Sequence, residues 1–344
     1  MNCANVRRVC ALAGTLFALG ACQTSPPPAP LASFAAVAPD EQVAAMHRGM
    51  NILSDDPVWR DPAQARFQTR HFARLREAGF DTVRMNLHPF AHADAAGAIN
   101  PAWLATLDRM VKAALDDGLT VILDEHDDHA CEADVADCGP KLQAVWNQIA
   151  TRYAREPNRL VFELLNEPHG RLTAEVWNAM LRDVLATVRA SNLRRNVIVG
   201  PAGWSSFDQL ATLDLPKDDD HLIVTVHYYT PMTFTHQGAS WVEQTKNLSG
   251  IAWGTDAEMA RLVRDFDGVK AWSDRHHRPI FLGEFGAYDK ADMDSRVRYI
   301  SAVARVAEAH GFAWAYWQFD SDFVAFEMDR DDWVAPILNA LAPP

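Results

Sequence analysis

Short apolar runs alternate with longer amphipathic stretches from about residue 47 onward, and this order constrains the fold more than any other feature. Most runs are continuously apolar, as expected for parallel strands covered on both faces. Eight runs have this character: Arg48–Ile52, Thr82–Leu87, Thr120–Leu123, Leu160–Leu165, Asn196–Val199, Leu222–Val226, Pro279–Leu282 and Phe312–Trp317. Eight strands, each followed by a helical pattern, predict one closed (β/α)8 barrel of the TIM-barrel type rather than an open sheet.

The stretches between the strands carry helix start signals. Asp61 and Asn100 each precede a proline, which is the pattern of a cap residue before proline at the first helical position. Thr255 and Glu258 have the spacing of a capping box. Apolar residues recur at helical spacing in the segment 104–115. We therefore expect a helix to begin at each of the three caps.

The N-terminal segment has the pattern of an export signal. Arg7 and Arg8 precede the apolar stretch Val9–Ala21, which is too short to span a bilayer. It ends in Leu19-Gly20-Ala21-Cys22, which resembles the lipobox of bacterial lipoproteins, with Cys22 as the lipidated residue. The alternative is an ordinary signal peptide with a chance cysteine. Both interpretations predict an exported protein, either secreted or held in the bacterial cell envelope at the outer membrane or in the periplasm.

The expected organisation is a signal peptide over residues 1–21, a flexible Pro/Ala-rich spacer over 22–40 and a catalytic barrel over 41–344. Proline is dense in the spacer, which excludes helix and central strand there. Of the five cysteines, only Cys131 and Cys138 belong to the expected barrel. In an exported protein, two cysteines in one loop most simply form a disulfide.

Composition narrows the classes of partner. The chain has 344 residues, 49% of them hydrophobic, and a formal net charge of −13. Such a chain is neither disordered nor collagen-like, and it lacks the basic surface that nucleic-acid binding requires. We expect no nucleic-acid partner and a membrane contact only through Cys22.

Two carboxylates stand where predicted strands end. Glu167 follows the fourth strand in Asn166-Glu167-Pro168, and Glu284 follows the seventh in Gly283-Glu284-Phe285. One such glutamate alone would most simply be a structural hydrogen-bond or ion-pair partner. Two at matching ends of different strands indicate a site, because a barrel of this kind carries its chemistry at the carboxyl ends of its strands.

The motifs around these glutamates, LLNEPHG and FLGEFGAY, resemble the acid/base and nucleophile motifs of glycoside hydrolase family 5. The resemblance extends from roughly Met46 to Leu341. Five further residues match the family pattern after strands two, three, six and eight: Arg84, His126, His227, Tyr229 and Trp317. The resemblance implies a retaining hydrolase, whose two carboxyl groups stand ~5–5.5 Å apart.

The resemblance also implies roles for these residues. Glu167 is expected to be the acid/base, and Glu284 the nucleophile, held as an anion by Arg84 and the Tyr229 hydroxyl. Asn166 is expected to bind the sugar 2-hydroxyl. His126 and His227 would bind the same sugar or orient Glu167, although each could equally be a satisfied core histidine.

Tryptophans divide into two groups by position. Trp103, Trp146, Trp177 and Trp272 lie in helical patterns and are expected to pack in the core. Trp204, Trp241, Trp253 and Trp317 lie after strands or in loops on the catalytic side, where an indole can stack on a sugar ring. Trp317 is the expected floor of the subsite that holds the cleaved sugar.

The segment 228–241 resembles the corresponding loop of bacterial family members that cleave β-1,4-glucans, some of which also cleave β-mannans. We therefore expect a monomeric endo-β-1,4-glucanase acting on a polysaccharide or oligosaccharide, with β-mannanase or xyloglucanase as alternatives. From another class, a non-catalytic carbohydrate-binding lipoprotein would need the aromatic platforms but not both glutamates.

The acidic segment 124–138 raises a further alternative, a metal-dependent barrel hydrolase. Its residue spacing fits no specific metal motif, so we expect no catalytic metal and no cofactor. Whether this segment binds a structural ion is a question that the sequence leaves open.

Overall fold

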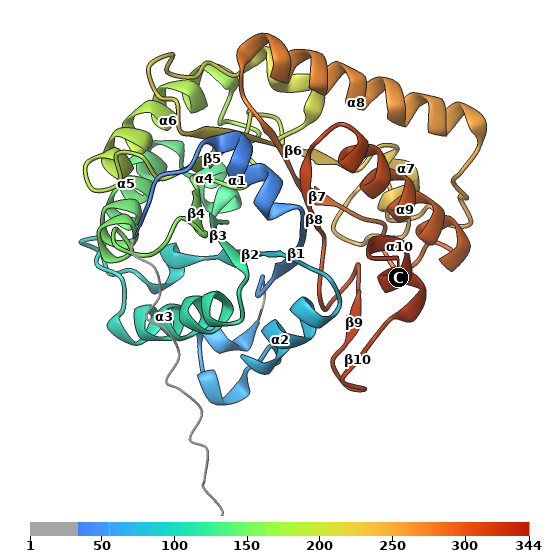
Figure 1. Cartoon of the computed structure of the whole chain (residues 1–344), viewed down its shortest axis with the longest axis horizontal. Coiled ribbons are helices and arrows are strands. Elements are labelled where there is room, and N and C mark those ends of the chain that lie inside the picture. The colour runs from blue at the N-terminus through green and yellow to red at the C-terminus, as the bar shows by residue number, and fades with distance from the viewer. Residues whose placement is uncertain (1–33, 55, 344) are drawn as a thin grey trace, which may run out of the picture. The chain divides into compact units, whose positions relative to one another are not determined.

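The computed structural model describes residues 34–54 and 56–343. Eight parallel strands close into a barrel in chain order (Figure 1). They are β1 (Arg48–Ile52), β2 (Thr82–Leu87), β3 (Thr120–Glu125), β4 (Leu160–Glu163), β5 (Val197–Val199), β6 (Leu222–Tyr228), β7 (Ile280–Phe285) and β8 (Ala313–Tyr316). Each predicted run overlaps one of these strands, so the predicted (β/α)8 barrel is confirmed. Strands β3, β6 and β7 run past the apolar runs into polar residues at the barrel mouth.

Helices surround the barrel (Figure 1). They are α1 (Pro39–Met46), α2 (Arg70–Glu77), α3 (Pro101–Asp116), α4 (Asp128–Ala133), α5 (Val135–Arg152), α6 (Ala174–Arg189), α7 (Met232–Thr235), α8 (Asp256–His276), α9 (Met293–Ala309) and α10 (Ala335–Leu341). Asn100 caps α3, and Thr255 with Glu258 forms the predicted capping box of α8. A two-stranded hairpin, β9 (Phe326–Glu327) and β10 (Asp332–Trp333), follows β8.

Two helix predictions were wrong in detail. Asp61 does cap the next turn through Ala63 N, but that turn is a three-residue 3-10 helix, and the α-helix after β1 begins only at Arg70. After β5 the chain forms the 3-10 helix Phe207–Thr212 instead of an α-helix. The stretch that follows it contains Pro216, which cannot donate a hydrogen bond to a continuing helix.

Helix α1 closes the end of the barrel opposite the strand carboxyl ends. Its Val43 and Met46 pack into one interior cluster with side chains from six strands: Ile122, Val161, Ile198, Ile223, Phe281, Ala313 and Ala315. The Thr82 hydroxyl, at the start of β2, donates to the carbonyl oxygen of Met46 at 2.8 Å. The barrel is therefore a filled core rather than a pore, and only its other end is open to ligands.

The folded unit begins earlier than the expected boundary at residue 41. The amide of Phe34 donates to the carbonyl oxygen of Arg155, and the Phe34 ring lies 4.7 Å from the Arg195 guanidinium carbon. Helix α1 then starts at Pro39, inside the predicted spacer. The predicted signal peptide, Cys22 and most of the spacer lie outside the described residues. None of the helices in the described part of the chain is long and apolar enough to cross a bilayer.

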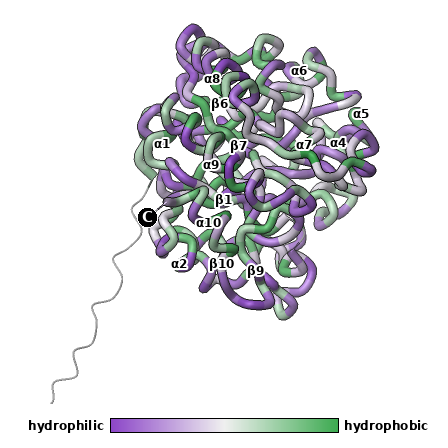
Figure 2. The backbone as a smooth tube through the Cα atoms, turned by 90° about the vertical axis from the view of Figure 1, so that its right-hand side faces the viewer, coloured by the Kyte–Doolittle hydropathy of each residue, from purple (hydrophilic) through white to green (hydrophobic). Residues whose placement is uncertain are grey.

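A second apolar layer fills the space between barrel and helices. Hydrophilic segments gather in the outer loops in Figure 2, while much of the hydrophobic backbone lies inside. Trp103, Trp146, Trp177 and Trp272 are buried in this layer, as predicted. Burial of such rings is a large favourable contribution, on the order of 2–3 kcal/mol each.

Candidate active site

The carboxyl ends of the strands bring the two glutamates together. Glu284 lies within β7, opposite His227 of β6, and Glu167 follows β4 by four residues. A β-bulge between Val226 and His227 shifts the register there, which is a common way to aim a side chain at a site. Only glycine fits at position 283, because a Cβ there would stand 2.8 Å from Nε2 of His227.

Glu284 is buried and accepts two hydrogen bonds. Nη1 of Arg84 donates to its Oε1 at 2.8 Å, and the Tyr229 hydroxyl donates to its Oε2 at 2.9 Å. Burial raises the pKa of Glu284 to about 7, whereas His227 and Arg84 favour the anion. Both hydrogen bonds also favour the anion. They fix the orientation of the Glu284 carboxylate as well.

Glu167 lies across the site from Glu284. Its Oε1 is 2.6 Å from Nδ1 of His227, and the same nitrogen is 3.7 Å from Oε2 of Glu284. One carboxylate oxygen of each glutamate and a nitrogen of His227 all lie within 4.8 Å of one another. Burial, followed by the charge of Asp128, raises the pKa of Glu167 well above its usual range. Glu167 is thus kept as a neutral acid beside a potential anion.

Arg84 is the centre of a buried charge network. Its Nε and Nη2 bind both oxygens of Glu163 at 2.8 and 2.9 Å, and Nη2 also lies 3.1 Å from Asp124. Nη1 donates to Oδ1 of Asn51 at 2.9 Å as well as to Glu284. Asn51, Asp124 and Glu163 were missed at the level of sequence. The available signal was a polar side chain inside a strand that is otherwise apolar.

His126 is fixed on three sides. Its Nδ1 lies 2.6 Å from Asp124 Oδ2, and Asn166 Nδ2 is 3.2 Å from its Nε2. Its ring stacks on Trp317 with centroids 5.6 Å apart and planes only 9° apart. Burial lowers the pKa of His126 well below its usual range, so the ring is neutral. Asn166 in turn accepts a hydrogen bond from Arg84 Nη2 at 2.7 Å, which links His126 to the charge network.

A pocket of about 1140 Å³ opens over these groups. Trp204 and Trp241 line it with 53% of each residue exposed, and Trp317 lines it beside His126. Large exposed indoles on a pocket wall suit a ligand with flat apolar faces. Trp253 was wrongly predicted as a platform: it is 3% exposed and packs edge-on against Tyr299 in the core.

The structure gathers most of the predicted site residues at this one pocket. Its lining includes Asn166, Glu167, His126, His227, Tyr229, Glu284, Trp204, Trp241 and Trp317. Arg84 is fully buried beneath the pocket and reaches it through Glu284 and Asn166.

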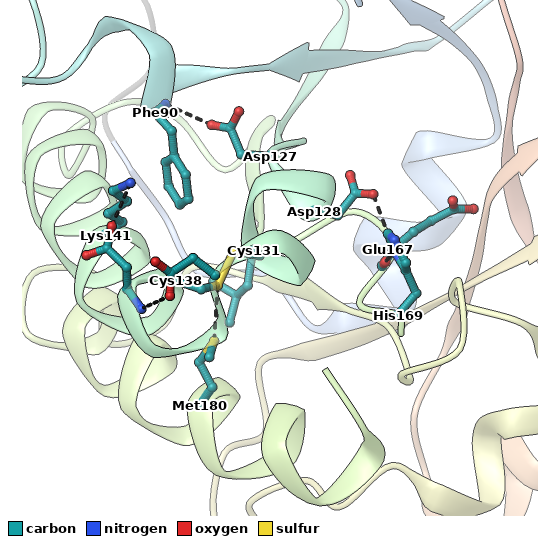
Figure 3. The surroundings of a disulfide bond; sticks show 12 residues. Phe90, Asp127, Asp128, Cys131, Cys138, Lys141, Glu167, His169 and Met180 are labelled. Atoms are coloured by element: carbon teal, nitrogen blue, oxygen red, sulfur yellow. Dashed lines mark hydrogen bonds and ion pairs between the residues drawn. A yellow bond between two sulfur atoms is a disulfide. The ribbon is translucent and has the colours of Figure 1, made fainter. Parts of the chain in front are cut away.

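The acidic segment forms helix α4 and the start of α5, and the structure contains a disulfide between Cys131 and Cys138 (Figure 3). The bond ties the short helix α4 to the first turns of α5. Asp128, at the start of α4, points toward His169 and the Glu167 backbone in Figure 3. In the described ranges, two residue groups could hold a metal ion: Asp128 with His129 and His169, and Glu167 with His227 and Glu284.

Comparison with known proteins agrees with this geometry. A family model described as cellulase, glycosyl hydrolase family 5, matches residues 41–322. Endoglucanase H of Acetivibrio thermocellus is 31% identical over 341 residues, covering 93% of this chain. Endoglucanase B of Clostridium cellulovorans is 27% identical, covering 78% of this chain. This chain spans only 35% and 64% of the lengths of these two relatives.

Solved structures give a close match over the whole barrel. The endoglucanase Cel5A from the hyperthermophilic Thermotoga maritima superposes with a TM-score of 0.84 and 36% identity, covering 89% of this chain and all of that one. The same enzyme was also solved with cellobiose and with mannotriose, and those structures give the same TM-score.

Proposed function

The chain belongs to glycoside hydrolase family 5, and on this basis we propose that it cleaves internal β-1,4 bonds of a glucan with retention of configuration. The observation that carries the mechanism is the short separation of the two carboxylates. An oxygen of Glu167 lies within 4.8 Å of an oxygen of Glu284. Retaining pairs stand ~5–5.5 Å apart, whereas inverting pairs stand ~6.5–9.5 Å apart to leave room for water.

In the first step, Glu284 attacks the anomeric carbon while Glu167 donates its proton to the leaving glycosidic oxygen. The hydrogen bonds from Arg84 and Tyr229 aim the attacking carboxylate. The raised pKa of Glu167 keeps its proton available near neutral pH. The product of this step is a glycosyl ester on Glu284.

In the second step, Glu167 accepts a proton from water while the water oxygen attacks the anomeric carbon, which breaks the bond from that carbon to Glu284 and releases Glu284 as a carboxylate. Esterification removes the negative charge of Glu284, so the pKa of Glu167 falls and the same residue becomes a base. His227 contacts Glu167 at 2.6 Å and is kept neutral by burial, which lowers its pKa. It can therefore orient Glu167 in both steps without adding a fixed charge.

Binding of the sugar is assigned to the groups around the two glutamates. Asn166 and His126 form the polar wall where the 2-hydroxyl of the cleaved sugar would lie, and Trp317, stacked on His126, is the floor. Trp204 and Trp241 are the exposed platforms for neighbouring sugars. Two aromatic platforms beyond the cleavage point suit a polymer rather than a single sugar.

A β-1,4-glucan is the first choice of substrate because the relatives reported above are named endoglucanases. A β-1,4-mannan is the second, and the mannotriose complex of the Thermotoga maritima enzyme supports it. Initial rates on β-glucan, glucomannan and galactomannan separate the two, since a glucanase leaves galactomannan intact.

The mechanism is tested by two substitutions. Glu284→Gln is expected to abolish cleavage of every substrate. Glu167→Gln should lower polymer kcat by roughly 10²–10⁴-fold, and should spare the cleavage of aryl glycosides whose leaving group needs no proton.

The stereochemistry of the product is a second test. The first product detected by proton NMR should be the β-anomer. Full polymer activity in either variant, or α-product appearing first, refutes the proposal; Glu77→Gln, an exposed glutamate on α2, is the matched control.

We also propose that the protein is exported and lipid-anchored through Cys22, which the sequence Leu19-Gly20-Ala21-Cys22 supports. Expression of the full chain and its Cys22→Ala variant with a labelled fatty acid tests this. Label is expected in the first protein and not in the second.

A further inference from the structure

We propose that Asp128, His129 and His169 bind one divalent transition-metal ion of the zinc class in the wall of the pocket. One donor atom from each of these side chains lies within 4.8 Å of the donors of the other two. Two imidazoles and one carboxylate favour Zn²⁺, Cu²⁺ or Ni²⁺ over Ca²⁺ or Mg²⁺, which prefer oxygen ligands alone. The group is separate from the two glutamates that perform the proposed reaction.

The pair Asp128 and His169 already has the spacing of two metal ligands. Oδ2 of Asp128 is 3.6 Å from Nδ1 of His169, and neighbouring ligands of a tetrahedral zinc ion are roughly 3.4 Å apart. The His129 ring stands edge-on to the His169 ring with centroids 5.0 Å apart. Because His129 is exposed, its side chain can turn to complete the site.

The backbone segments that carry the three ligands are held together. Asp128 and His129 begin α4, and His169 lies two residues after Glu167. Arg171 joins these segments, because its guanidinium donates to the carbonyl oxygens of Glu132 and Ala133 at the end of α4. The disulfide also anchors α4 (Figure 3). Ligands on fixed segments are the condition for a preorganised metal site.

The second oxygen of Asp128 has a partner of its own. Nδ2 of Asn166 lies 3.3 Å from Oδ1 of Asp128 and leaves Oδ2 to face His169. Such outer hydrogen bonds orient the carboxylate ligands of metal sites. Asp128 and His129 also line the pocket, so the proposed site borders it.

Occupation of this site should affect the reaction, and this half of the inference rests on the proposed function. Nδ1 of His169 now donates to the carbonyl oxygen of Glu167 at 2.6 Å. When a metal ion takes Nδ1, the neutral ring carries its proton on Nε2 and this hydrogen bond is lost. The ion thus competes for a contact to the backbone of the acid/base and occupies the pocket wall, so it should inhibit cleavage.

Binding is tested on the full chain without a histidine tag, by calorimetric titration with Zn²⁺. One ion should bind, and His129→Ala and Asp128→Asn should each raise the dissociation constant at least tenfold. His277→Asn is the control, because it removes an exposed imidazole outside the group at a left-handed residue where Asn is tolerated. Absence of binding to the unaltered chain, or equal affinity in His129→Ala, overturns the proposal.

Two further measurements locate the ion. Electron paramagnetic resonance of bound Cu²⁺ should show two imidazole nitrogens in the unaltered chain and one in His129→Ala. Glu284→Gln should bind Zn²⁺ as the unaltered chain does. If Glu284→Gln loses binding and His129→Ala keeps it, the ion lies between the two glutamates and the proposed site is wrong.

Inhibition is measured separately from binding. Zn²⁺ should lower the initial rate on β-glucan over the concentration range in which it binds, and His129→Ala should need at least tenfold more Zn²⁺ for the same loss. Bound Zn²⁺ without loss of rate contradicts the inhibitory role. A metal-free chain that never cleaves glucan contradicts the proposed function instead, while the binding result stands.

Discussion

Arg84 shows how one residue sets the chemistry of the whole pocket. It is fully buried and lies between three carboxylates, those of Glu163, Asp124 and Glu284. Two of them hold the guanidinium in place, and the third is the proposed nucleophile. Burial opposes ionisation of Asp124, whose pKa is raised to about 6, while Arg84 favours its anion. The direction in which Arg84 points therefore depends on Glu163 and Asp124, two buried acids outside the lining of the pocket.

Loss of Glu163 should destabilise the protein strongly. Glu163→Ala removes the carboxylate that binds Arg84 through two hydrogen bonds in a fully buried position, and we expect a loss of about 3–5 kcal/mol in the free energy of unfolding. Urea unfolding measures this loss. Glu77→Ala, on an exposed surface of α2, should cost under about 1 kcal/mol. Equal effects of the two substitutions would contradict the assigned role.

The Tyr229 hydroxyl should set the acid limb of the pH profile. Glu284 must be ionised to attack, and its pKa is raised by burial to about 7, so kcat/KM should fall as the pH drops through that value. Tyr229→Phe removes a hydrogen bond that favours the anion. The pKa of Glu284 should then rise further, moving the acid limb to higher pH by roughly one unit. A limb that stays fixed or moves to lower pH argues against this hydrogen bond.

At this scale the sequence was most informative where a motif ends a strand. Glu167 and Glu284 were predicted because they follow recognisable apolar runs, and His227 and Tyr229 because they match the family pattern. Asn51 and Glu163 were not predicted because their importance lies in which way they point inside a strand, and only the barrel register decides that. The prediction that Trp253 is a platform was wrong because a loop position does not determine whether the ring turns inward.

Among the elements, α4 is the one whose stability depends most on a covalent link. It has six residues, too few to be stable as an isolated helix. The disulfide and the contacts from Arg171 fix it beside the segment after Glu167. Accurate placement of Asp128 in the pocket wall depends on these links.

Removal of the disulfide should lower stability by about 2–3 kcal/mol in the chain-entropy model, given a sequence separation of 7 residues. The double variant Cys131→Ala/Cys138→Ala, followed by urea unfolding, measures this. The unaltered protein in reductant should unfold at the same urea concentration as the double variant, and reductant should leave the variant unchanged. Identical unfolding of the variant and the oxidised protein would show that the bond contributes nothing.

The elements also show where sequence patterns mislead. All eight strands were predicted, because continuous apolar runs are a strong signal. An α-helix was predicted after Asp61 where the structure has only a short 3-10 helix, because a cap and a proline can start a helix without fixing its length. Helix α1 was not predicted: it straddles the expected boundary between spacer and barrel, and its burial comes from the barrel end that it covers.

For the whole molecule, net charge predicts how the choice of substrate responds to salt. The chain carries −13 in total, so an anionic polymer is repelled while a neutral glucan is not. Raising the ionic strength from 0.01 to 0.15 M shortens the screening length from about 30 to about 8 Å. We expect kcat/KM on carboxymethylcellulose to rise and that on neutral β-glucan to stay level. A parallel change on both polymers would show that charge plays no part.

The closed end of the barrel is also where the described chain begins. Residues 34–46 run along the end that α1 seals, where Asn196, just before β5, also binds the carbonyl oxygen of Val37. The catalytic pocket opens at the other end. The described chain therefore enters the barrel at one end and offers the pocket to a polymer at the other.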